Sequence, residues 1–330
     1  MKALFIGGTG NISTSVSRLA VKLGIDLYLL NRGERKINLP GTTQIQADIH
    51  KPRQVSRLLQ THHFDCVVDW IAYEPADIER DIELFRNKTR QFIFISSASV
   101  YQRPVLNPII TEGTPLANPF WEYSRLKIAC EERLMQAYRT DGFPVTIVRP
   151  SLTYDTYFPI AIGGWNTYTL VDRMKRGQPI IVHGDGNSIW VVTHADDLAV
   201  GFVGLMGHPN SLGHAFHITS DELLTWDQIY QTIAAAAGVE AKMVHIPSDF
   251  IARVNPGIGA GLLGDKVSSV IFDNTKIKTF VPEYKAVIPF HQGIRRTLAW
   301  YDEDERRKVV DTKVNEEMDA ILAAYKDNLA

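Results

Sequence analysis

The first half of the chain alternates short apolar runs with helical patterns. Buried strands are predicted at residues 3–8, 26–32, 43–49, 64–72, 90–99 and 144–151, and helices between them at 13–24, 52–62, 74–87 and 122–142. The strand runs are apolar on both faces, which is typical of a parallel sheet covered by helices on each side. The alternation predicts an α/β fold with a doubly wound parallel sheet.

The second half breaks into shorter pieces. Helices are predicted at residues 165–177, 194–207 and 225–238, strands at 179–186 and 214–220, and further helical pieces over 273–280, 289–304 and 315–330. Thr225 and Gln228 fit a capping box. We predict one part at residues 1–155, which also takes a strand and a helix from about 190–220, and a smaller C-terminal α/β part over 156–330.

The amino-acid composition limits the binding partners and the cellular compartment that we expect for this protein. The 330 residues carry 35 basic and 37 acidic side chains, and this formal net charge of -2 argues against a nucleic acid or an anionic membrane as partner. No stretch reaches the ~18 apolar residues that a membrane span needs, and the first apolar run is too short for a secretory signal. Only Cys66 and Cys130 occur, so a reducing cytoplasm is the predicted location. No His, Cys or Asp spacing suggests a metal site.

The sequence GGTGNISTSV, residues 7–16, follows the first predicted strand and opens the first helix. Gly7 would permit a tight turn, and Gly10 would let the backbone approach a pyrophosphate at the helix N-terminus. Ser13 stands where a third glycine is expected, and its hydroxyl could bond a carbonyl of the previous turn or a phosphate. Alone, the motif also fits an ordinary strand–turn–helix.

Two further features carry candidate chemistry. The sequence YSRLK places Tyr123 and Lys127 on one face of a helix, about 6 Å apart. A nearby ammonium favours the phenolate, so Tyr123 could act as a general base toward an alcohol. Ser96, Ser97 and Ser99 end the fifth predicted strand, where open α/β sheets carry catalytic residues. Each feature alone also fits a solvated pair or a polar strand end.

Together, the glycine turn, the serine cluster and the Tyr-x-x-x-Lys pair resemble the short-chain dehydrogenase/reductase superfamily. The segments RPSLTYD (149–155), GDGNSIWVVTHADDLA (184–199) and 272–304 resemble its extended branch, the NAD-dependent epimerase/dehydratase family. The resemblance covers nearly the whole chain. It implies a Rossmann-type dinucleotide-binding domain at 1–155 and a mainly substrate-binding part after it.

The resemblance also implies roles for individual residues. Ser97 would be the catalytic serine, Tyr123 the acid/base, and Lys127 would bind the nicotinamide ribose and lower the pKa of the tyrosine. The implied cofactor contacts are Gly7, Thr9, Gly10, Asn11, Ile12, Asn31, Arg32, Asp48 and Ile49 (at adenine), Ala72 (at the adenosine ribose), Lys127, and Pro150 (at the nicotinamide amide). The candidate substrate contacts are Tyr73, Ser99, Asn118, Thr153 and Trp190.

The end of the second predicted strand departs from the family pattern. NAD specificity usually rests on an acidic residue about 20 positions after the glycine turn, whereas this chain has Asn31 and Arg32 there. Arg32, with Arg35 or Lys36, could pair a 2′-phosphate. We therefore favour NADP over NAD, although either cofactor fits if Arg32 only stacks on adenine.

A second departure concerns the substrate. Nucleotide-sugar epimerases commonly carry an arginine four residues before the histidine of the 184–199 segment, and here that position, counted from His194, is Trp190. A tryptophan cannot neutralise a diphosphate, but it can stack on a sugar or a base. Arg295 and Arg296 could supply charge instead, and Trp190 could equally be a core residue. His194 itself is expected to open a helix.

These observations predict an NAD(P)-dependent enzyme acting on a sugar or nucleotide-sugar hydroxyl or ketone, with an epimerase as the leading interpretation. An NADPH-dependent carbonyl reductase or dehydrogenase of a non-nucleotide substrate stays open, as does an RNA-binding or regulatory protein on the same fold. Elimination is disfavoured because Ala98 and Ser99, and not an acid/base pair, follow Ser97. A homodimer is expected by analogy with the superfamily.

Overall fold

A seven-stranded sheet in the order β12-β7-β5-β4-β1-β2-β3 forms the first part of the molecule. Its strands are β1 (Lys2–Ile6), β2 (Asp26–Asn31), β3 (Thr42–Gln46), β4 (Cys66–Asp69), β5 (Phe92–Ile95), β7 (Val145–Arg149) and β12 (Ala215–His217). All six pairings are parallel. The computed structural model, which describes residues 1–34 and 39–329, thus confirms the predicted α/β class.

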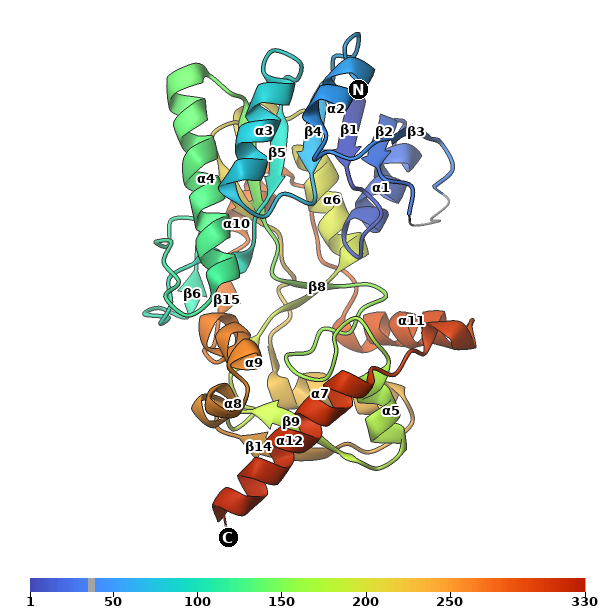
Figure 1. The fold of residues 1–330 in the computed structure, drawn as a ribbon, viewed down its shortest axis with the longest axis vertical. Helices are drawn as coiled ribbons and strands as arrows, with labels where there is room; N and C mark the ends of the chain where they lie inside the picture. The colour runs from blue at the N-terminus through green and yellow to red at the C-terminus, as the bar shows by residue number, and fades with distance from the viewer. Residues whose placement is uncertain (35–38, 330) are drawn as a thin grey trace.

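Helices cover both faces of the sheet (Figure 1). They are α1 (Ser13–Lys22) and α6 (Ala195–Leu205) on one face, and α2 (Pro52–Leu58), α3 (Pro75–Phe85) and α4 (Glu122–Asp141) on the other. In β1, Ala3 and Phe5 belong to the core under α1, whereas Leu4 and Ile6 belong to the opposite core. Successive strand side chains point to opposite faces, so a strand covered on both faces is expected to be mostly apolar.

The second part lies below the first in Figure 1 and contains the C-terminal helix. Its strands are short pairs: β8 (Leu152–Tyr154) with β11 (Val192–His194), β9 (Pro179–His183) with β14 (Lys242–Ile246), and β10 (Ile189–Trp190) with β13 (Leu224–Thr225). A further pair, β6 (Ile109–Ile110) with β15 (Ile271–Phe272), joins the long loop after β5 to the C-terminal half. A strand of two residues has no detectable alternation, so the pairs β10–β13 and β6–β15 escaped prediction. The five-residue strand β14 was not predicted either.

The remaining helices are α5 (Thr169–Lys175), α7 (Trp226–Ala236), α8 (Ser248–Val254), α9 (Pro256–Gly261), α10 (Thr275–Phe280), α11 (Phe290–Asp302) and α12 (Thr312–Leu329). Short turns are η1 (Ala98–Val100), η2 (Pro209–Ser211), η4 (Glu305–Arg307) and the π-helical η3 (Leu262–Lys266). The capping box of Thr225 and Gln228 is confirmed. His194 opens α6, because its Nδ1 accepts the Asp196 amide at 3.1 Å. Within the described residues, no helix has the length and apolar character needed to cross a bilayer.

The strand order reverses at β1, and we expect a ligand-binding crevice at the carboxyl ends of the strands there. From β1 the chain moves outward through β2 and β3, and it then returns to β4 on the other side of β1. Ligands of open α/β sheets bind outside the carboxyl ends of the strands at such a reversal. Gly7 follows β1 and residues 70–72 follow β4, so both border this crevice.

Candidate active site

The glycine turn after β1 has a backbone conformation at Gly7 that favours glycine, and little space for a side chain there. Its φ of 94° lies in the left-handed region, and an added Cβ would lie 3.2 Å from Ile71 and 3.3 Å from Trp70. The Gly10 amide donates to the Ser13 hydroxyl at 2.7 Å, and Ser13 is buried at the start of α1. The serine at the third position therefore accepts a hydrogen bond from the turn's own backbone, while a bond from its hydroxyl to a phosphate stays a prediction.

The next residues connect the turn to the rest of the protein. The Asn11 amide donates to the Thr153 carbonyl at 3.1 Å, which ties the turn to β8. The Asn11 side-chain oxygen is buried, and within residues 1–34 and 39–329 it has no hydrogen-bond partner. Thr9 is half-buried in the turn, and Ile12 precedes α1 and packs against the sheet core. A turn that excludes side chains and holds an unused buried polar atom fits a bound dinucleotide.

Lys127 spans the carboxyl ends of β4 and β5. Its Nζ donates to the carbonyls of Ala72 at 2.6 Å and Ile95 at 2.8 Å. The Ala72 carbonyl is positioned by Asp69, whose carboxylate accepts the amides of Ile71 and Ala72 and so ends β4 earlier than predicted. Lys127 is 2% exposed, and burial lowers its pKa to about 8. Its ammonium is thus held at the crevice by main-chain oxygens.

Tyr123 lies beside the serines that follow β5, and its hydroxyl forms a hydrogen bond with Ser97. The Ser97 and Ser99 hydroxyls are 2.9 Å apart, and Ser124 donates to Ser99 at 2.8 Å. Burial raises the pKa of Tyr123, and a hydrogen bond from Ser97 opposes this rise. The expected lowering by Lys127 is not found in the protein alone, because its Nζ lies 5.8 Å from the ring centre and faces carbonyls.

The other predicted cofactor residues lie along the crevice or at the far ends of β2 and β3. Pro150 is buried, and its carbonyl accepts the Ala98 amide at 2.8 Å. The Asp48 carboxylate accepts the His50 amide, Ile49 is buried, and Asn31 donates to Gln44 at 3.1 Å.

Arg32 is already paired. Its guanidinium lies 2.8 Å from the Glu34 carboxylate, and both side chains are more than half exposed. Arg35 and Lys36, which were predicted to assist Arg32, lie outside the described residues.

The predicted substrate residues divide into two groups. Tyr73 is 52% exposed and lies 6.2 Å from the Tyr123 ring, while Asn118 is buried and donates to the Ser99 carbonyl at 2.8 Å. Thr153 is half-buried beside the glycine turn. Trp190 is 1% exposed and packs 5.6 Å from Trp226, so its ring belongs to the core of the second part and has no free face for stacking.

Three charged residues near the site were not predicted. Arg103 lies in the loop after β5, and Asp265 and Lys266 lie in η3. The Arg103 guanidinium contacts Asp265 at 3.2 Å, although 162 residues separate them in sequence. No spacing or motif links these positions, so only the folded structure reveals the cluster.

Comparisons with known proteins agree on one family. The sequence model described as "NAD dependent epimerase/dehydratase family" matches residues 3–219. The chain is 24% identical to 2′-dehydrokanamycin reductase of Streptomyces kanamyceticus, over 77% of this chain and 71% of that protein. It is 29% identical to the chloroplast stem-loop binding protein of 41 kDa b of Arabidopsis thaliana, over 76% and 67%.

Solved structures share the fold. The epimerase Mth375 of Methanothermobacter thermautotrophicus superposes with a TM-score of 0.76 at 16% identity, covering 92% of this chain and 93% of that one. UDP-glucose 4-epimerase of Bifidobacterium longum, in complex with NAD+ and UDP, superposes with a TM-score of 0.74 at 16% identity, covering 94% and 100%.

Proposed function

This chain belongs to the NAD-dependent epimerase/dehydratase family, and on that premise we propose that it is an epimerase of a sugar or nucleotide sugar. The observation that carries the proposal is the meeting of Ser97, Tyr123 and Lys127 at the carboxyl ends of β4 and β5, beside the glycine turn. This grouping suits proton transfer to and from a hydroxyl next to a dinucleotide.

The chain's own residues supply the proton chemistry. A bound nicotinamide cofactor, held by the glycine turn and Lys127, would accept and return the hydride. The Tyr123 oxygen takes the proton of the substrate hydroxyl, and Ser97 donates a hydrogen bond to the reacting oxygen. Because the protein alone raises the pKa of Tyr123, its phenolate needs stabilisation, and the Ser97 hydrogen bond, which lowers this pKa, supplies part of it.

The fate of the ketone separates an epimerase from a reductase. An epimerase keeps the ketone bound and returns hydride to its other face, so it regenerates its cofactor in each cycle. We expect denatured protein to release a tightly held nicotinamide dinucleotide, and UDP-glucose or a related nucleotide sugar to change configuration without net cofactor consumption. Chromatography of the released cofactor and NMR of the sugar measure these two results. An empty site together with stoichiometric cofactor oxidation would contradict the proposal.

The cofactor we propose is NAD, which replaces the NADP preference drawn from sequence. Glu34 neutralises Arg32 and would repel a 2′-phosphate, and the similar epimerase of Bifidobacterium longum is solved with NAD+. Replacing Glu34 with glutamine should therefore raise affinity for NADP relative to NAD by roughly two- to fivefold, because an exposed charge pair contributes little. Fluorescence titration of both cofactors measures the ratio. An unchanged ratio would place the 2′-position away from Arg32.

A reductase of a non-nucleotide substrate is the second candidate. Trp190 occupies the position of the expected arginine and is buried in the core, so it cannot neutralise a diphosphate. The similarity to 2′-dehydrokanamycin reductase points in the same direction. Steady oxidation of NADPH or NADH by a keto sugar that lacks a nucleotide would favour this function over the epimerase.

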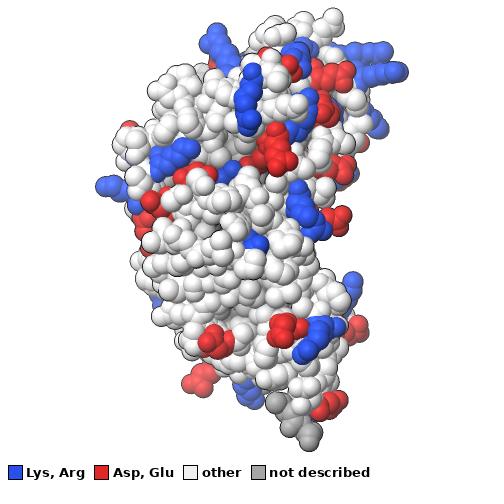
Figure 2. Space-filling model, turned by 90° about the vertical axis from the view of Figure 1, so that its left-hand side faces the viewer, with Lys and Arg blue, Asp and Glu red and all other residues white. Residues whose placement is uncertain are grey.

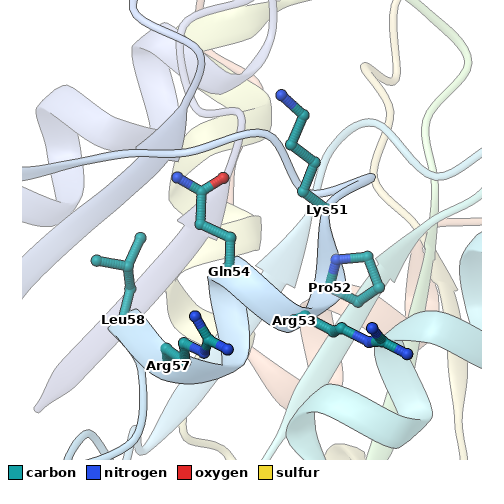
Figure 3. Close-up of a pocket in the computed structure, with 6 residues that line it drawn as sticks. All are labelled: Lys51, Pro52, Arg53, Gln54, Arg57 and Leu58. Carbon is teal, nitrogen blue, oxygen red and sulfur yellow. The ribbon is translucent and has the colours of Figure 1, made fainter.

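The RNA-binding alternative has weaker support. Its basis is the likeness to the stem-loop binding protein and a shallow hollow on α2 lined by Lys51, Pro52, Arg53, Gln54, Arg57 and Leu58 (Figure 3). Arg53 and Arg57 on one short helix, with Lys51 just before it, offer only a small positively charged surface for RNA. On the face shown in Figure 2, Lys and Arg are interspersed with Asp and Glu. An RNA affinity that falls steeply as the salt concentration rises would favour this alternative.

The homodimer and the cytoplasmic location stay predictions.

A further inference from the structure

A buried cluster of three charges lies near the proposed active site. Lys266 Nζ contacts one oxygen of Asp265 at 2.7 Å, and an Arg103 Nη contacts the other at 3.2 Å. The three side chains are only 2% (Arg103), 11% (Asp265) and 15% (Lys266) exposed. Two cations against one carboxylate leave this cluster, which we call the Arg103–Asp265–Lys266 cluster, with a surplus positive charge. Buried charges are normally balanced, so an anionic ligand bound here would be stabilised.

A single side chain connects the cluster to the catalytic serines. The Asn118 amide donates both to the Ser99 carbonyl at 2.8 Å and to the Gly264 carbonyl at 2.6 Å. Gly264 precedes Asp265 in η3, and a Cβ there would lie 2.6 Å from Trp121. The Asp265 charge is also close enough to contribute to the raised pKa of Tyr123. The cluster is thus fixed beside the atoms that would handle the substrate hydroxyl.

Several hydrogen-bond donors around the cluster are unused. Arg103 Nε and Trp190 Nε1 are buried and have no hydrogen-bond partner among the residues that the structure describes. Lys266 Nζ lies 5.1 Å from the centre of the Trp190 ring, so the lysine and the indole belong to one neighbourhood. His183 bonds the Lys266 carbonyl, and burial lowers its pKa to about 4, so it adds no charge at neutral pH. Unpaired buried donors are costly, and an acceptor-rich ligand would satisfy them.

We propose that the Arg103–Asp265–Lys266 cluster binds an oxyanion of the substrate, either a sugar carboxylate or a phosphate. This assignment rests on the proposed function in one respect: it takes the ligand to be the substrate on which Tyr123 acts. The guanidinium has an unused N–H to donate, and the surplus charge selects against a neutral group. Since the cluster adjoins Ser99 and Tyr123, the oxyanion lies near the reacting carbon, which favours a carboxylate on the sugar ring.

The test compares ligands that differ by one carboxylate. UDP-glucose and UDP-glucuronate share the nucleotide, and UDP alone reports on the diphosphate. We expect UDP-glucuronate to bind wild-type protein about tenfold tighter than UDP-glucose in isothermal titration, since one charged hydrogen-bonded pair has roughly that effect. Arg103→Gln or Lys266→Gln should remove this preference. If the variants instead weaken all three ligands equally, the recognised oxyanion is a phosphate.

The Asp265→Asn variant tests the proposal through the direction in which it changes the affinity for UDP-glucuronate. It removes the carboxylate that repels an anion, so it should strengthen UDP-glucuronate binding while Arg103→Gln weakens it. A cluster that only holds the fold together would give weaker or unchanged binding in both variants, and that result would overturn the proposal. Thermal unfolding of each variant shows whether it is folded, and Lys266→Gln, at the most exposed position, serves if Arg103→Gln does not fold.

The proposal and the proposed function can fail separately. Binding is measured without turnover, so an inactive Tyr123→Phe protein should show the same carboxylate preference. If no nucleotide sugar binds, inorganic phosphate and glucuronate, with glucose as the neutral control, are compared for their effect on the unfolding temperature. Stabilisation by the anions that is lost in Arg103→Gln supports the anion site whatever the reaction proves to be. An equal effect on wild type and Arg103→Gln would refute it.

Discussion

Replacing Tyr123 with phenylalanine is expected to lower kcat by roughly 10²–10⁴-fold, the range that a positioned acid/base contributes, and to leave cofactor affinity nearly unchanged. The substitution removes only the phenolic oxygen, while the ring contacts with Trp121 and Tyr73 remain. Lys127 keeps its two carbonyl partners, so the cofactor side of the site is preserved. Turnover of the nucleotide sugar and titration of the dinucleotide give the two quantities.

Tyr138→Phe is the matched control for this prediction. Tyr138 lies on the same helix α4, is half-buried as Tyr123 is, and packs against Gly213 far from the serine cluster. Removing the Tyr138 hydroxyl should leave kcat within about twofold of wild type, because substitutions far from the reacting groups usually have small effects. If Tyr123→Phe retained comparable turnover, Tyr123 would not be the acid/base and the proposed chemistry would fail.

The second large effect concerns stability. Arg149 and Glu131 form a buried, two-pronged ion pair, with Nε–Oε1 at 2.9 Å and Nη2–Oε2 at 2.6 Å, and both side chains are nearly inaccessible. Arg149→Met would leave the Glu131 carboxylate buried and unpaired. We expect the free energy of unfolding to fall by about 3–5 kcal/mol, the usual cost of breaking such a pair. Urea denaturation followed by circular dichroism measures this loss.

An exposed pair provides the comparison. Arg86 lies 3.1 Å from Asp141, but the two side chains are 47% and 35% exposed. Arg86→Met should therefore lower the free energy of unfolding far less than Arg149→Met does, because solvent screens such pairs. The double variant Arg149→Met, Glu131→Leu should recover part of the stability, since it removes the unpaired charge. Equal losses in Arg86→Met and Arg149→Met would show that burial does not govern the Arg149 pair.

The main sheet and its helices could be predicted from sequence because their signals are local. A strand buried on both faces is mostly apolar, as in 3–8 and, apart from Thr146 and Arg149, the strand within 144–151, and a covering helix repeats its apolar positions every third or fourth residue. Helix ends were predictable for the same reason, since Thr225 and Gln228 cap a helix through atoms only three residues apart. The two-residue strands β6, β10, β13 and β15 carry no such periodicity, so only their partners define them.

For the site, the sequence by itself determined which groups are present and roughly where. Gly7, Ser97, Tyr123 and Lys127 stand at strand ends or at helix spacing, and that placement follows from local geometry. Only the tertiary structure decided their electrostatic state and their partners. It buries Trp190 in a core and pairs Arg32 with Glu34. The tertiary structure also raises the pKa of Tyr123, and it brings Arg103 into contact with Asp265, 162 residues further along the chain. Burial and charge pairing depend on segments far apart in the chain, and local sequence patterns do not encode them.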